Sequence, residues 1–371
     1  MRITIVTAFP DLIRSYLGFS VVGRGVSSGA LDVRVLDLRD FAEGQYRQVD
    51  DYSFGGGGMV LMAEPLARAV ESLDDQGEAY VVCPTPQGVH LHQELVEELA
   101  RKDHLVLVCG HYEGMDERFV EEHVDLEVSL GDFVLTGGEL PALAVLDSVA
   151  RLVPGVVGRM EAVRNDSFYR GFLDHPHYTR PAVWRGIRAP EVLLGGDHGA
   201  IEEFRRDLAV RRTLERRPDL LARCGIMGYL WGRFYVYLGE EGLELDRCAA
   251  VSGAFGAVRM LAHRSLRGHE PQGVKFFPSF GGALRWVAQR DRAKPMVLSV
   301  SPRGGFEWLG VKRRVLEYRG PVVLALGGAF QGDLELGHPE GPTGKWGHPE
   351  VLGYWLGRLF DLDRGALVSD N

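Results

Sequence analysis

The sequence predicts an α/β protein built on parallel sheets. Short apolar, β-branched segments alternate with segments of helical periodicity, a pattern typical of parallel strands joined by helices. Glycine-rich segments follow several of the predicted strands, at the edge where parallel sheets bind their ligands. The length of 371 residues is enough for two or three domains, and 45% hydrophobic residues can fill their cores.

The first alternation of strands and helices covers about the first 130 residues. Strands are predicted at Arg2–Thr7, Asp32–Leu36, Ala79–Cys83 and His104–Cys109, and helices at Val21–Ser27, Pro65–Leu73 and Leu91–Arg101. A short apolar run, Val124–Val128, then precedes the glycine-rich segment Ser129–Pro141. Glycine has no Cβ, so the backbone there can approach a ligand closely. Because Thr85–Gly88 and Gly110–Gly114 also follow strands, we expect these three loops to converge on one pocket.

A second alternation begins near residue 230, where we place a domain boundary. Before it, residues 190–221 are predicted to be helical, with Asp197 at the start of a helix. Arg159–Tyr169 has little apolar periodicity, which predicts a mobile linker. Strands of the second alternation are predicted at Phe234–Leu238, Gly273–Phe277, Met296–Val300 and Val322–Leu326. We find no short repeat in the chain.

Composition excludes several classes of protein. The four cysteines are widely spaced and form no C-x-x-C pair, so neither a disulfide framework nor a zinc site is expected. We therefore expect the protein to reside in the cytoplasm. No apolar run is long enough to span a membrane, and the start of the chain does not resemble a signal peptide. Residues 1–232 hold 24 Lys and Arg against 36 Asp and Glu, whereas residues 233–371 hold 18 against 15. A nucleic-acid partner would therefore need a local basic surface, such as the arginines between Arg180 and Arg217, and these also fit a solvated helix face.

Three polar motifs are candidates for chemistry. Gly55–Gly58 is not followed by the Lys and Ser/Thr of a P-loop, so it fits a flexible flap or close backbone approach to a substrate. Asp166 lies in the polar linker, as either a solvated turn residue or a general base on a segment that orders with substrate. Asp174, His175 and His177 are close in sequence, but no further ligand cluster supports zinc there, and we predict no metal centre.

These segments together resemble the bacterial tRNA (guanine-N1)-methyltransferase family, TrmD, from Met1 to about Leu221. The resemblance rests on many motifs in order rather than on any single one. They are Arg39–Phe41, Val49–Asp51, Phe54–Met62, Pro86–Gly88, Cys109–Glu113, Asp116–Arg118, Ser129–Pro141, Asp147–Ser148, Asp166–Phe168, Pro176–Pro181 and Glu191–Leu194. The glycine run Gly55–Gly58 is one residue shorter than the usual family pattern, which puts the fine placement of the base in doubt.

The resemblance implies a SPOUT-type parallel sheet with a deep trefoil knot. It implies a knotted domain at residues 1–158 that binds S-adenosylmethionine, a mobile linker at 159–172 and a small helical tRNA-binding domain at 173–230. It also implies a cytoplasmic homodimer with no membrane association. By resemblance the cofactor is bound by Pro84, Thr85, Pro86, Gly110, Tyr112, Glu113, Ser129, Leu130, Gly131, Asp132, Phe133, Val134, Leu135, Gly137 and Gly138.

The implied reaction is methylation of guanine N1 at tRNA position 37, next to the anticodon. Guanine N1 carries a proton, which the enzyme must remove while charge spreads to O6. By resemblance Asp166 is the general base and Arg151 stabilises the O6 charge. The implied substrate contacts are Gly55, Gly56, Gly57, Asp174, His177 and Arg180. A Mg²⁺ ion would be held loosely by carboxylates such as Glu113 or Asp166. The alternatives are an inactive tRNA-binding protein and a methyltransferase for another RNA base.

Residues 233–371 resemble a second SPOUT-type RNA methyltransferase domain. The segments that carry this resemblance are Ser299–Gly305, Leu326–Gly332 and Gly347–Leu352. Phe330 and Trp346 would flank an adenine ring in such a domain. The alternative is a domain that only dimerises or holds tRNA, with Lys312–Arg314 as its phosphate contact.

Overall fold

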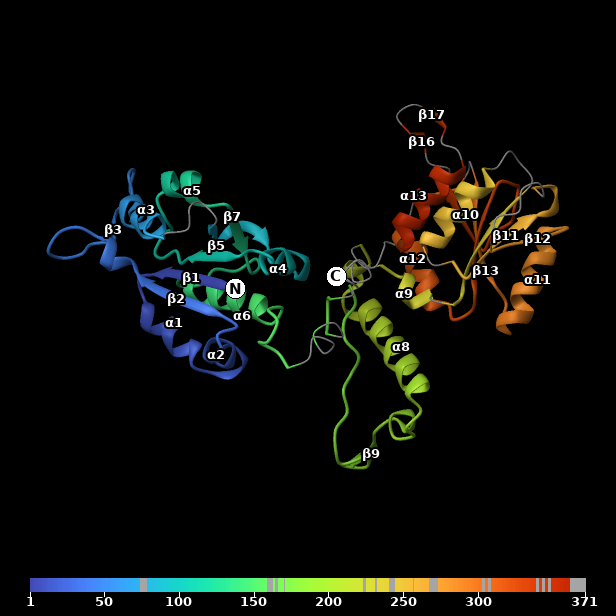
Figure 1. Ribbon diagram of the computed structural model, residues 1–371, viewed down its shortest axis with the longest axis horizontal. Helices are drawn as coiled ribbons and strands as arrows, with labels where there is room; N and C mark the ends of the chain where they lie inside the picture. Colours follow the sequence, from blue (N-terminus) through green and yellow to red (C-terminus); the bar gives the residue numbers. More distant parts are fainter. Residues whose placement is uncertain are drawn as a thin grey trace. The chain divides into compact units, whose positions relative to one another are not determined.

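In the computed structural model, the chain divides into two compact units. Unit 1 is Met1–Asn165 and unit 2 is Asp166–Asn371, each with a sheet of its own (Figure 1). The structure describes residues 1–73, 79–158, 163, 166–169, 171–222, 225–230, 232–239, 244–255, 257–266, 273–301, 304–305, 308–337, 340–341, 344–345 and 348–360. The partition predicted at residues 158, 172 and 230 is finer than this division and stays a prediction. Half of the predicted linker 159–172 lies outside the described residues, and so do Trp346 and Gly347.

The sheet of unit 1 is parallel and has the strand order β2-β1-β6-β5-β7. Its strands are β1 (Arg2–Thr7), β2 (Asp32–Asp37), β5 (Ala79–His90), β6 (His104–Val108) and β7 (Leu126–Ser129). β1 lies between β2 and β6, so that Thr4 pairs with Arg34 on one side and with Val106 on the other. The predicted α/β class with parallel strands is confirmed.

Helices cover both faces of this sheet (Figure 1). One face carries α1 (Pro10–Leu17), α2 (Ser20–Ser27), α4 (Gln93–Leu99) and α6 (Glu139–Ala150). The other face carries the 3₁₀ turn η1 (Leu38–Phe41), α3 (Ala63–Glu71) and α5 (Glu117–His123). Ile3 and Ile5 point to the first face and Val6 to the second, as alternation along a strand requires. The sequence did not predict α6 because buried residues surround most of this helix, so it lacks an amphipathic period.

Strand β5 differs from its prediction. It was expected to end near Cys83 and to give way to a loop at Thr85–Gly88, but it continues to His90. The residues between form an excursion inside the strand, because Pro84 and Val89 both pair with Val128 of β7. Pro84 and Pro86 have no N–H to give to a ladder, so pairing is interrupted there. At Gly88 the two strands approach so closely that a Cβ would lie 2.3 Å from the carbonyl carbon of Glu127.

Unit 2 contains a six-stranded parallel sheet with the order β12-β11-β10-β14-β13-β15. Its strands are β10 (Phe234–Leu238), β11 (Arg259–His263), β12 (Val274–Phe277), β13 (Met296–Ser301), β14 (Val322–Leu326) and β15 (Leu334–Gly337). The predicted strands at β10, β12, β13 and β14 are present. The sequence did not predict β11 and β15.

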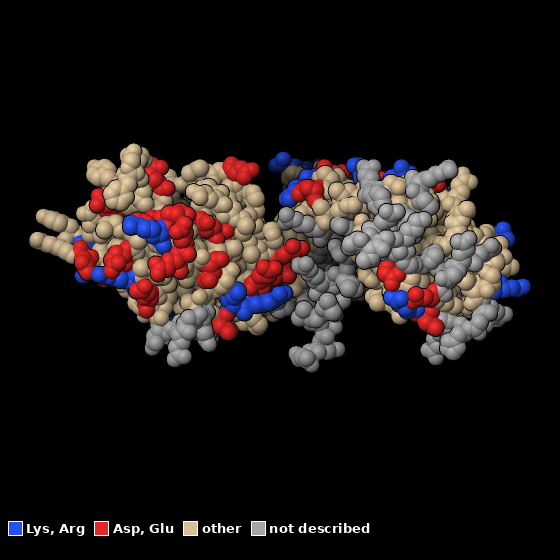
Figure 2. Space-filling model, turned by 90° about the horizontal axis from the view of Figure 1, so that it is seen from above, with Lys and Arg blue, Asp and Glu red and all other residues tan. Residues whose placement is uncertain are grey.

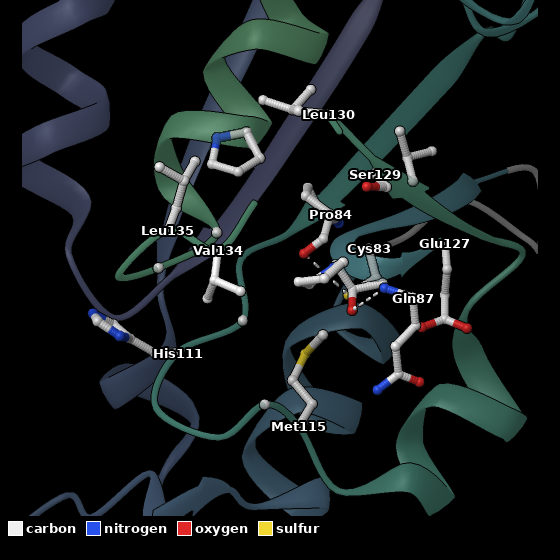
Figure 3. A pocket seen from close by; sticks show the side chains of 18 of the residues that line it. Cys83, Pro84, Gln87, His111, Met115, Glu127, Ser129, Leu130, Val134 and Leu135 are labelled. Atoms are coloured by element: carbon white, nitrogen blue, oxygen red, sulfur yellow. Dashed lines mark hydrogen bonds between the residues drawn. The ribbon is translucent and has the colours of Figure 1, made fainter. Parts of the chain in front are cut away.

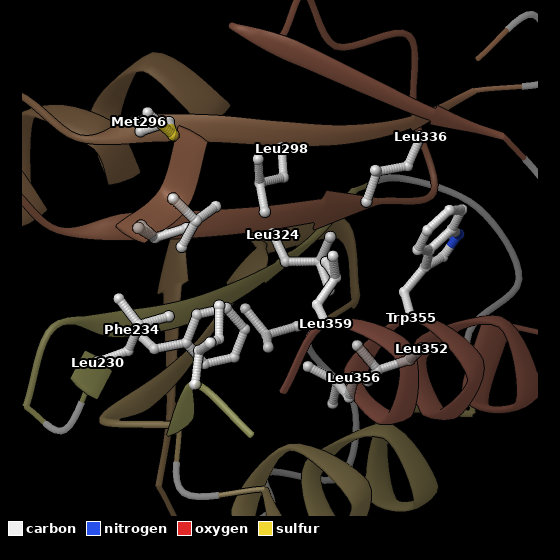
Figure 4. Close-up of a cluster of buried hydrophobic side chains, with 14 of the residues drawn as sticks. Leu230, Phe234, Met296, Leu298, Leu324, Leu336, Leu352, Trp355, Leu356 and Leu359 are labelled. Carbon is white, nitrogen blue, oxygen red and sulfur yellow. The ribbon is translucent and has the colours of Figure 1, made fainter. Parts of the chain in front are cut away.

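The core of unit 2 lies between this sheet and its helices. α10 (Leu245–Ala254), α12 (Trp308–Glu317) and α13 (His348–Phe360) cover one face, and α11 (Phe280–Asp291) covers the other. Figure 4 shows side chains of α13 facing leucines of the strands, with Leu352 and Leu356 on the helix and Leu324 on β14. Trp355 is 1% exposed, and its indole N–H donates to the Gly337 carbonyl at 2.9 Å. This bond satisfies the one polar atom that the ring buries.

The segment before this sheet contains a long helix, α8 (His198–Arg216). Asp197 caps it as predicted, since its Oδ1 accepts the Ala200 N–H at 3.1 Å. The other short elements of unit 2 are η2 (Glu191–Leu193), η3 (Pro218–Ala222), α9 (Met227–Leu230) and the hairpins β8 (Val183–Trp184) with β9 (Ile187–Arg188) and β16 (Glu340–Gly341) with β17 (Gly344–Lys345). Unit 1 also contains the hairpin β3 (Asp50–Tyr52) with β4 (Met59–Leu61). Among the described helices, none is both long and apolar enough to cross a membrane.

The proposed phosphate contact at Lys312–Arg314 is wrong for its first residue. Lys312 is fully buried, and its ammonium group donates to the Leu221 carbonyl at 3.1 Å. A lysine that faces the core cannot contact a phosphate at the surface. Arg313 and Arg314 are exposed.

Candidate functional site

A pocket of about 390 Å³ opens at the carboxyl ends of β5, β6 and β7 in unit 1. Figure 3 shows side chains from three chain segments around it, including Pro84 from β5, His111 after β6, and Leu130 and Val134 after β7. These segments are the three loops that the sequence expected to converge. Parallel sheets bind ligands at this edge because the loops that leave the strands meet there.

Nearly all of the residues implied for cofactor binding line this pocket. They are Pro84, Thr85, Pro86, Gly110, Tyr112, Glu113, Ser129, Leu130, Gly131, Phe133, Val134, Leu135, Gly137 and Gly138. Asp132 is not among the lining residues. Its side chain is 98% exposed, and its Oδ1 lies 3.6 Å from Nε2 of His90.

Close backbone contacts join two of the three loops. The Gly138 N–H donates to the Gly110 carbonyl at 2.7 Å, and Gly137 pairs with His111 in an antiparallel bridge. A Cβ on Gly138 would lie 2.7 Å from the Gly110 nitrogen, closer than any real Cβ contact. Glycine is therefore required at this crossing, and the pocket wall there is made of peptide groups rather than side chains.

A buried carboxylate supports the pocket from behind. Glu139, at the start of α6, is 4% exposed, and it accepts a hydrogen bond from Thr7 Oγ1 at 2.8 Å. The thiols of this region are not nucleophiles. Burial raises the pKa of Cys83, which lines the pocket, to about 12. Burial, with the nearby charge of Glu139, raises the pKa of Cys109 well above its usual value.

The sequence reading omitted several lining residues. Glu117 and Val120 belong to α5, Met115 lies just before it, and Pro141 comes from the first turn of α6. Neither helix was predicted, so the strand pattern did not indicate Glu117 and Val120, whereas Pro141 ends the predicted loop Ser129–Pro141. A usable signal was Asp116, which caps α5 by accepting the Arg118 N–H at 3.1 Å.

The glycine run implied for substrate binding forms the tip of the β3–β4 hairpin. Gly55, Gly56 and Gly57 have φ values of 85°, 86° and 117°, which glycine adopts without strain, and open space surrounds each. The base of the hairpin is tied to the pocket. The Glu113 N–H donates to the Met59 carbonyl at 3.1 Å, and the Leu61 N–H donates to the Gly114 carbonyl at 3.0 Å.

The two residues implied for catalysis belong to different units. Arg151 follows the last turn of α6 in unit 1, and its side chain is exposed. Asp166 begins unit 2 and is half-buried. Its neighbour Ser167 accepts the Asp174 N–H at Oγ, at 2.9 Å, and Arg212 of α8 donates to the Asp174 carbonyl at 3.3 Å. These bonds anchor the Asp166 segment to α8 within unit 2.

Asp174 is the centre of a polar cluster in that segment. Its Oδ1 lies 2.6 Å from His175 Nδ1, and its Oδ2 lies 2.7 Å from His177 Nε2. Burial would raise the pKa of Asp174, but the hydrogen bonds from His177 and His175 outweigh it and lower that pKa. Burial lowers the pKa of His175 despite the adjacent carboxylate. The ligand atoms of the three side chains lie within 4.8 Å of one another, close enough to share a cation. Arg180, the last residue implied for substrate binding, is exposed.

Charge is distributed unevenly in both units. Figure 2 shows Asp and Glu side chains gathered on one face of unit 1, and α5 exposes Glu117, Glu121 and Glu122. In unit 2, helix α8 exposes both signs of charge, with Arg205, Arg206, Arg211 and Arg216 beside Glu202, Glu203 and Glu215. Arg206 Nη2 lies 3.6 Å from Glu202 Oε1.

Comparison with known proteins gives one consistent result. The model of the family "tRNA (Guanine-1)-methyltransferase TrmD" matches residues 1–223. A tRNA (guanine-N(1)-)-methyltransferase of Moorella thermoacetica is 50% identical over 230 residues, which cover 61% of this chain and 92% of the relative. The namesake from Magnetococcus marinus is 52% identical over 229 residues, 60% of this chain and 90% of the relative. That of Thermotoga maritima is 49% identical over 253 residues, 68% of this chain and 96% of the relative. The chain therefore belongs to the TrmD family of tRNA (guanine-1)-methyltransferases.

Proposed function

We propose that this protein transfers a methyl group from S-adenosylmethionine to N1 of guanine at tRNA position 37. The observation that carries the proposal is the pocket at β5, β6 and β7, together with family membership. In this proposal the pocket holds the methyl donor and Asp166 takes the proton from the base.

The pocket suits an adenosine-containing donor. Its volume lies within the range of about 300–1,000 Å³ that small-molecule sites occupy. Glycine backbone lines the pocket at Gly110, Gly137 and Gly138, and Val134, Leu135 and Pro141 supply apolar contacts. When bound there, S-adenosylmethionine supplies an electrophilic methyl carbon, so the protein need only prepare the base that accepts it.

Preparation of the base is assigned to Asp166 and Arg151. Guanine N1 becomes a good nucleophile only when its proton leaves, and Asp166 accepts that proton as general base. The charge that then spreads to O6 is stabilised by the Arg151 guanidinium. The bonds that tie Ser167 and Asp174 to α8 support this role, because a general base must be held in place.

The charge distribution supports a tRNA partner held chiefly by unit 2. Phosphates are attracted by arginine and repelled by carboxylates, so we assign backbone contacts to exposed Arg206 and Arg211 of α8 rather than to the acidic face of unit 1. Arg180, Asp174 and His177 are assigned to the anticodon loop, and Gly55–Gly57 to the flap over the target base. The base must leave its stack to be reached.

The proposal includes the finer features that the resemblance implies. These are a trefoil knot in unit 1, a homodimer, cytoplasmic residence and a Mg²⁺ ion held loosely near Glu113 or Asp166. The close contact of Gly138 with Gly110 supports the knot, since a chain that threads tightly needs residues without a Cβ at the crossing.

Methylation of defined tRNAs tests the proposal. The full chain is incubated with methyl-labelled S-adenosylmethionine and a tRNA that has guanosine at position 37 and another guanosine before it. The matched control is the same tRNA with adenosine at position 37. We expect 1-methylguanosine in digests of the first tRNA and no label in the second. A labelled control tRNA would mean another target base, and an unlabelled first tRNA would mean an inactive binding protein.

A further inference from the structure

The helices before the second sheet share one hydrophobic core with that sheet. Val210 of α8, Leu221 of η3 and Leu230 of α9 are all buried. They belong to a single cluster with apolar side chains of β10, β13 and β14 and of the helices α12 and α13, and Figure 4 shows Leu230 and Leu324 as members of it. Because apolar surface is buried on both sides of this contact, separation of α8 from the sheet would expose it to water.

Polar contacts fix where η3 and α8 lie on this core. Lys312 of α12 is fully buried, and its ammonium group donates to the Leu221 carbonyl at 3.1 Å. Arg319, just after α12, places its Nη2 2.8 Å from Oδ2 of Asp207, a mostly buried side chain of α8. A buried charge is stable only with its partner, so these contacts specify one position of α8 and η3 on the sheet.

Helix α8 in turn holds the segment that carries Asp166. The Leu173 N–H donates to Oγ1 of Thr213, a fully buried residue of α8, at 2.9 Å. Phe172 packs against the same hydrophobic cluster as the sheet, and its carbonyl accepts the Phe168 N–H at 2.7 Å. An uninterrupted series of contacts therefore leads from the sheet through α8 to Phe168, which closely follows Asp166 in the chain.

The residues that hold α8 and η3 from the side of the sheet lie outside the region that the family model matches. That model ends at residue 223, and 230 residues of this chain already cover 92% of the Moorella thermoacetica relative. Lys312 and Arg319 both come later in the chain. Their contacts to η3 and α8 are therefore a feature of this chain and not of the region that the family model describes.

The second sheet has the same strand frame as the sheet of unit 1. In unit 1 the order is β2-β1-β6-β5-β7, and in unit 2 the strands β11-β10-β14-β13-β15 stand in the corresponding order, with β12 added at one edge. The Val81 N–H donates to Asp125 Oδ2 at 2.7 Å, and the Val297 N–H donates to Asp333 Oδ2 at 2.8 Å. In each sheet this bond joins β5 or β13 to the residue that directly precedes the last strand.

An excursion like that of β5 is also present after β13. Val300 and Gly305 both pair with Leu336 of β15. A Cβ on Gly304 would lie 2.2 Å from the Leu336 carbonyl carbon, so glycine is required where the two segments meet. These contacts within the sheet do not involve Arg319, so the sheet keeps them when its contact with α8 is changed.

We propose that the second sheet is the base on which the Asp166 segment is positioned for methyl transfer, and that Arg319 and Lys312 are positioning residues for this reaction. The inference rests on the proposed role of Asp166 as general base. A shift of α8 along the sheet moves Thr213 and with it Leu173, so the Asp166 carboxylate leaves the place where it accepts the proton. A misplacement of about 1 Å, caused far from the chemistry, can cost about 10²-fold in rate. Arg319 thus acts through Asp166 and not by contact with the reacting atoms.

Charge reversal at the contact between Arg319 and Asp207 tests this inference on the full chain. Arg319→Glu sets two carboxylates against each other, and the double variant Arg319→Glu with Asp207→Lys restores opposite charges. The matched control is Arg285→Glu, the same change at an exposed arginine of α11, which lies on the other face of the sheet. Two quantities are measured for each variant. They are the hydrogen exchange of the Phe168 and Leu173 amides and the single-turnover methylation rate with saturating S-adenosylmethionine and tRNA.

Arg319→Glu is expected to speed the exchange of both amides and to lower the single-turnover rate by up to about 10²-fold. The double variant should recover both quantities, and Arg285→Glu should change neither. Saturating tRNA excludes a loss of tRNA affinity as the cause. A contact that only stabilised the fold would lower the unit 2 thermal transition and leave the rate below that transition unchanged. Arg319→Gln, which removes the charge without repulsion, gives the same comparison if the reversed variant does not fold.

Two outcomes separate this inference from the proposed function. An unchanged rate in Arg319→Glu, when the wild type methylates the position-37 guanosine, would overturn the positioning role and leave the proposed function intact. Faster exchange at Phe168 and Leu173 in that variant, recovered in the double variant, in a chain that methylates no such guanosine would overturn the proposed function. The attachment of the Asp166 segment to the sheet would then stand by itself.

Discussion

The two sheets share a frame and differ in what is attached to it. Both have an aspartate that receives the amide of the strand carrying the excursion, and both have a glycine where that excursion touches its neighbour. Only unit 1 adds a helix after the next-to-last strand, and the residues of that helix close the pocket. The strands shared by the two sheets provide backbone peptide groups at this edge, whereas the reactive and charged side chains come from the elements that are added to them.

The largest expected effect concerns the general base, which is not part of the sheet of unit 1. Asp166→Ala is expected to lower methyl transfer by about 10²–10⁴-fold, the usual contribution of a general base. Binding of S-adenosylhomocysteine should stay unchanged, since the lining of the pocket belongs to unit 1 and Asp166 to unit 2. Single-turnover methylation and calorimetry on one preparation measure both. Asp11→Ala, which removes a carboxylate that is 97% exposed, is the matched control. Full turnover in the Asp166 variant would remove the assignment.

The equivalence of the two excursions is tested by one substitution in each unit. Gly88→Val and Gly304→Val each force a side chain against the backbone of the neighbouring strand. Each is expected to destabilise its own unit by about 3 kcal/mol, the upper end of ordinary overpacking. Differential scanning calorimetry should show a different transition lowered by each variant. Gly253→Ala in α10, where a Cβ meets nothing within 4 Å, should leave both transitions in place. If both valine variants lower the same transition, the two excursions do not belong to independent frames.

Removal of the shared aspartate should have a smaller effect. Asp125→Ala leaves the Val81 N–H without its acceptor, and Asp333→Ala does the same to Val297. The loss of one partner of a buried amide is expected to cost about 1–2 kcal/mol in each unit. Chemical denaturation followed by hydrogen exchange at Val81 and Val297 measures the effect locally. Unequal losses in the two units would mean that the bond has lost its role in one of them.

Much of this frame could be predicted from the sequence, but its repetition could not. Buried strands such as Arg2–Thr7 and Phe234–Leu238 are continuous apolar runs, which the pattern identifies directly. Strand β15 was missed because Leu334–Gly337 is short and exposes Glu335 between leucines. The correspondence between Asp333 and Asp125 is defined by strand pairing, so it could not be found while β15 was missing from the prediction. Connections of different length also shift the spacing between equivalent residues, so no fixed period exists.

The candidate site was likewise predictable from the sequence only in part. Glycine-rich loops after strands were predicted, and they line one pocket, where Gly138 leaves no room for a Cβ beside the backbone of Gly110. The contributions of α5 were missed, since a seven-residue helix with one fully buried aromatic residue, Phe119, gives almost no periodic signal. The burial of Lys312 was also beyond the sequence, which shows a basic run but not that its first member faces Leu221.

The smallest of the expected effects is a difference between the two units in how acid lowers their thermal stability. In unit 2 the folded-state pKa of His175 is lowered by burial, so the unfolded chain takes up the proton first. The stability that this histidine contributes is present above its ordinary pKa of 6.5 and is lost as the pH falls through its lower folded value. In unit 1 the hydrogen bonds from Arg118 lower the pKa of Asp116, so its contribution is lost only below 3.8. As the pH falls below 6.5, the unit 2 transition should therefore fall by a few degrees more in the wild type than in His175→Asn, measured by calorimetry at each pH. An unchanged pH dependence in that variant would mean that His175 does not titrate in this window.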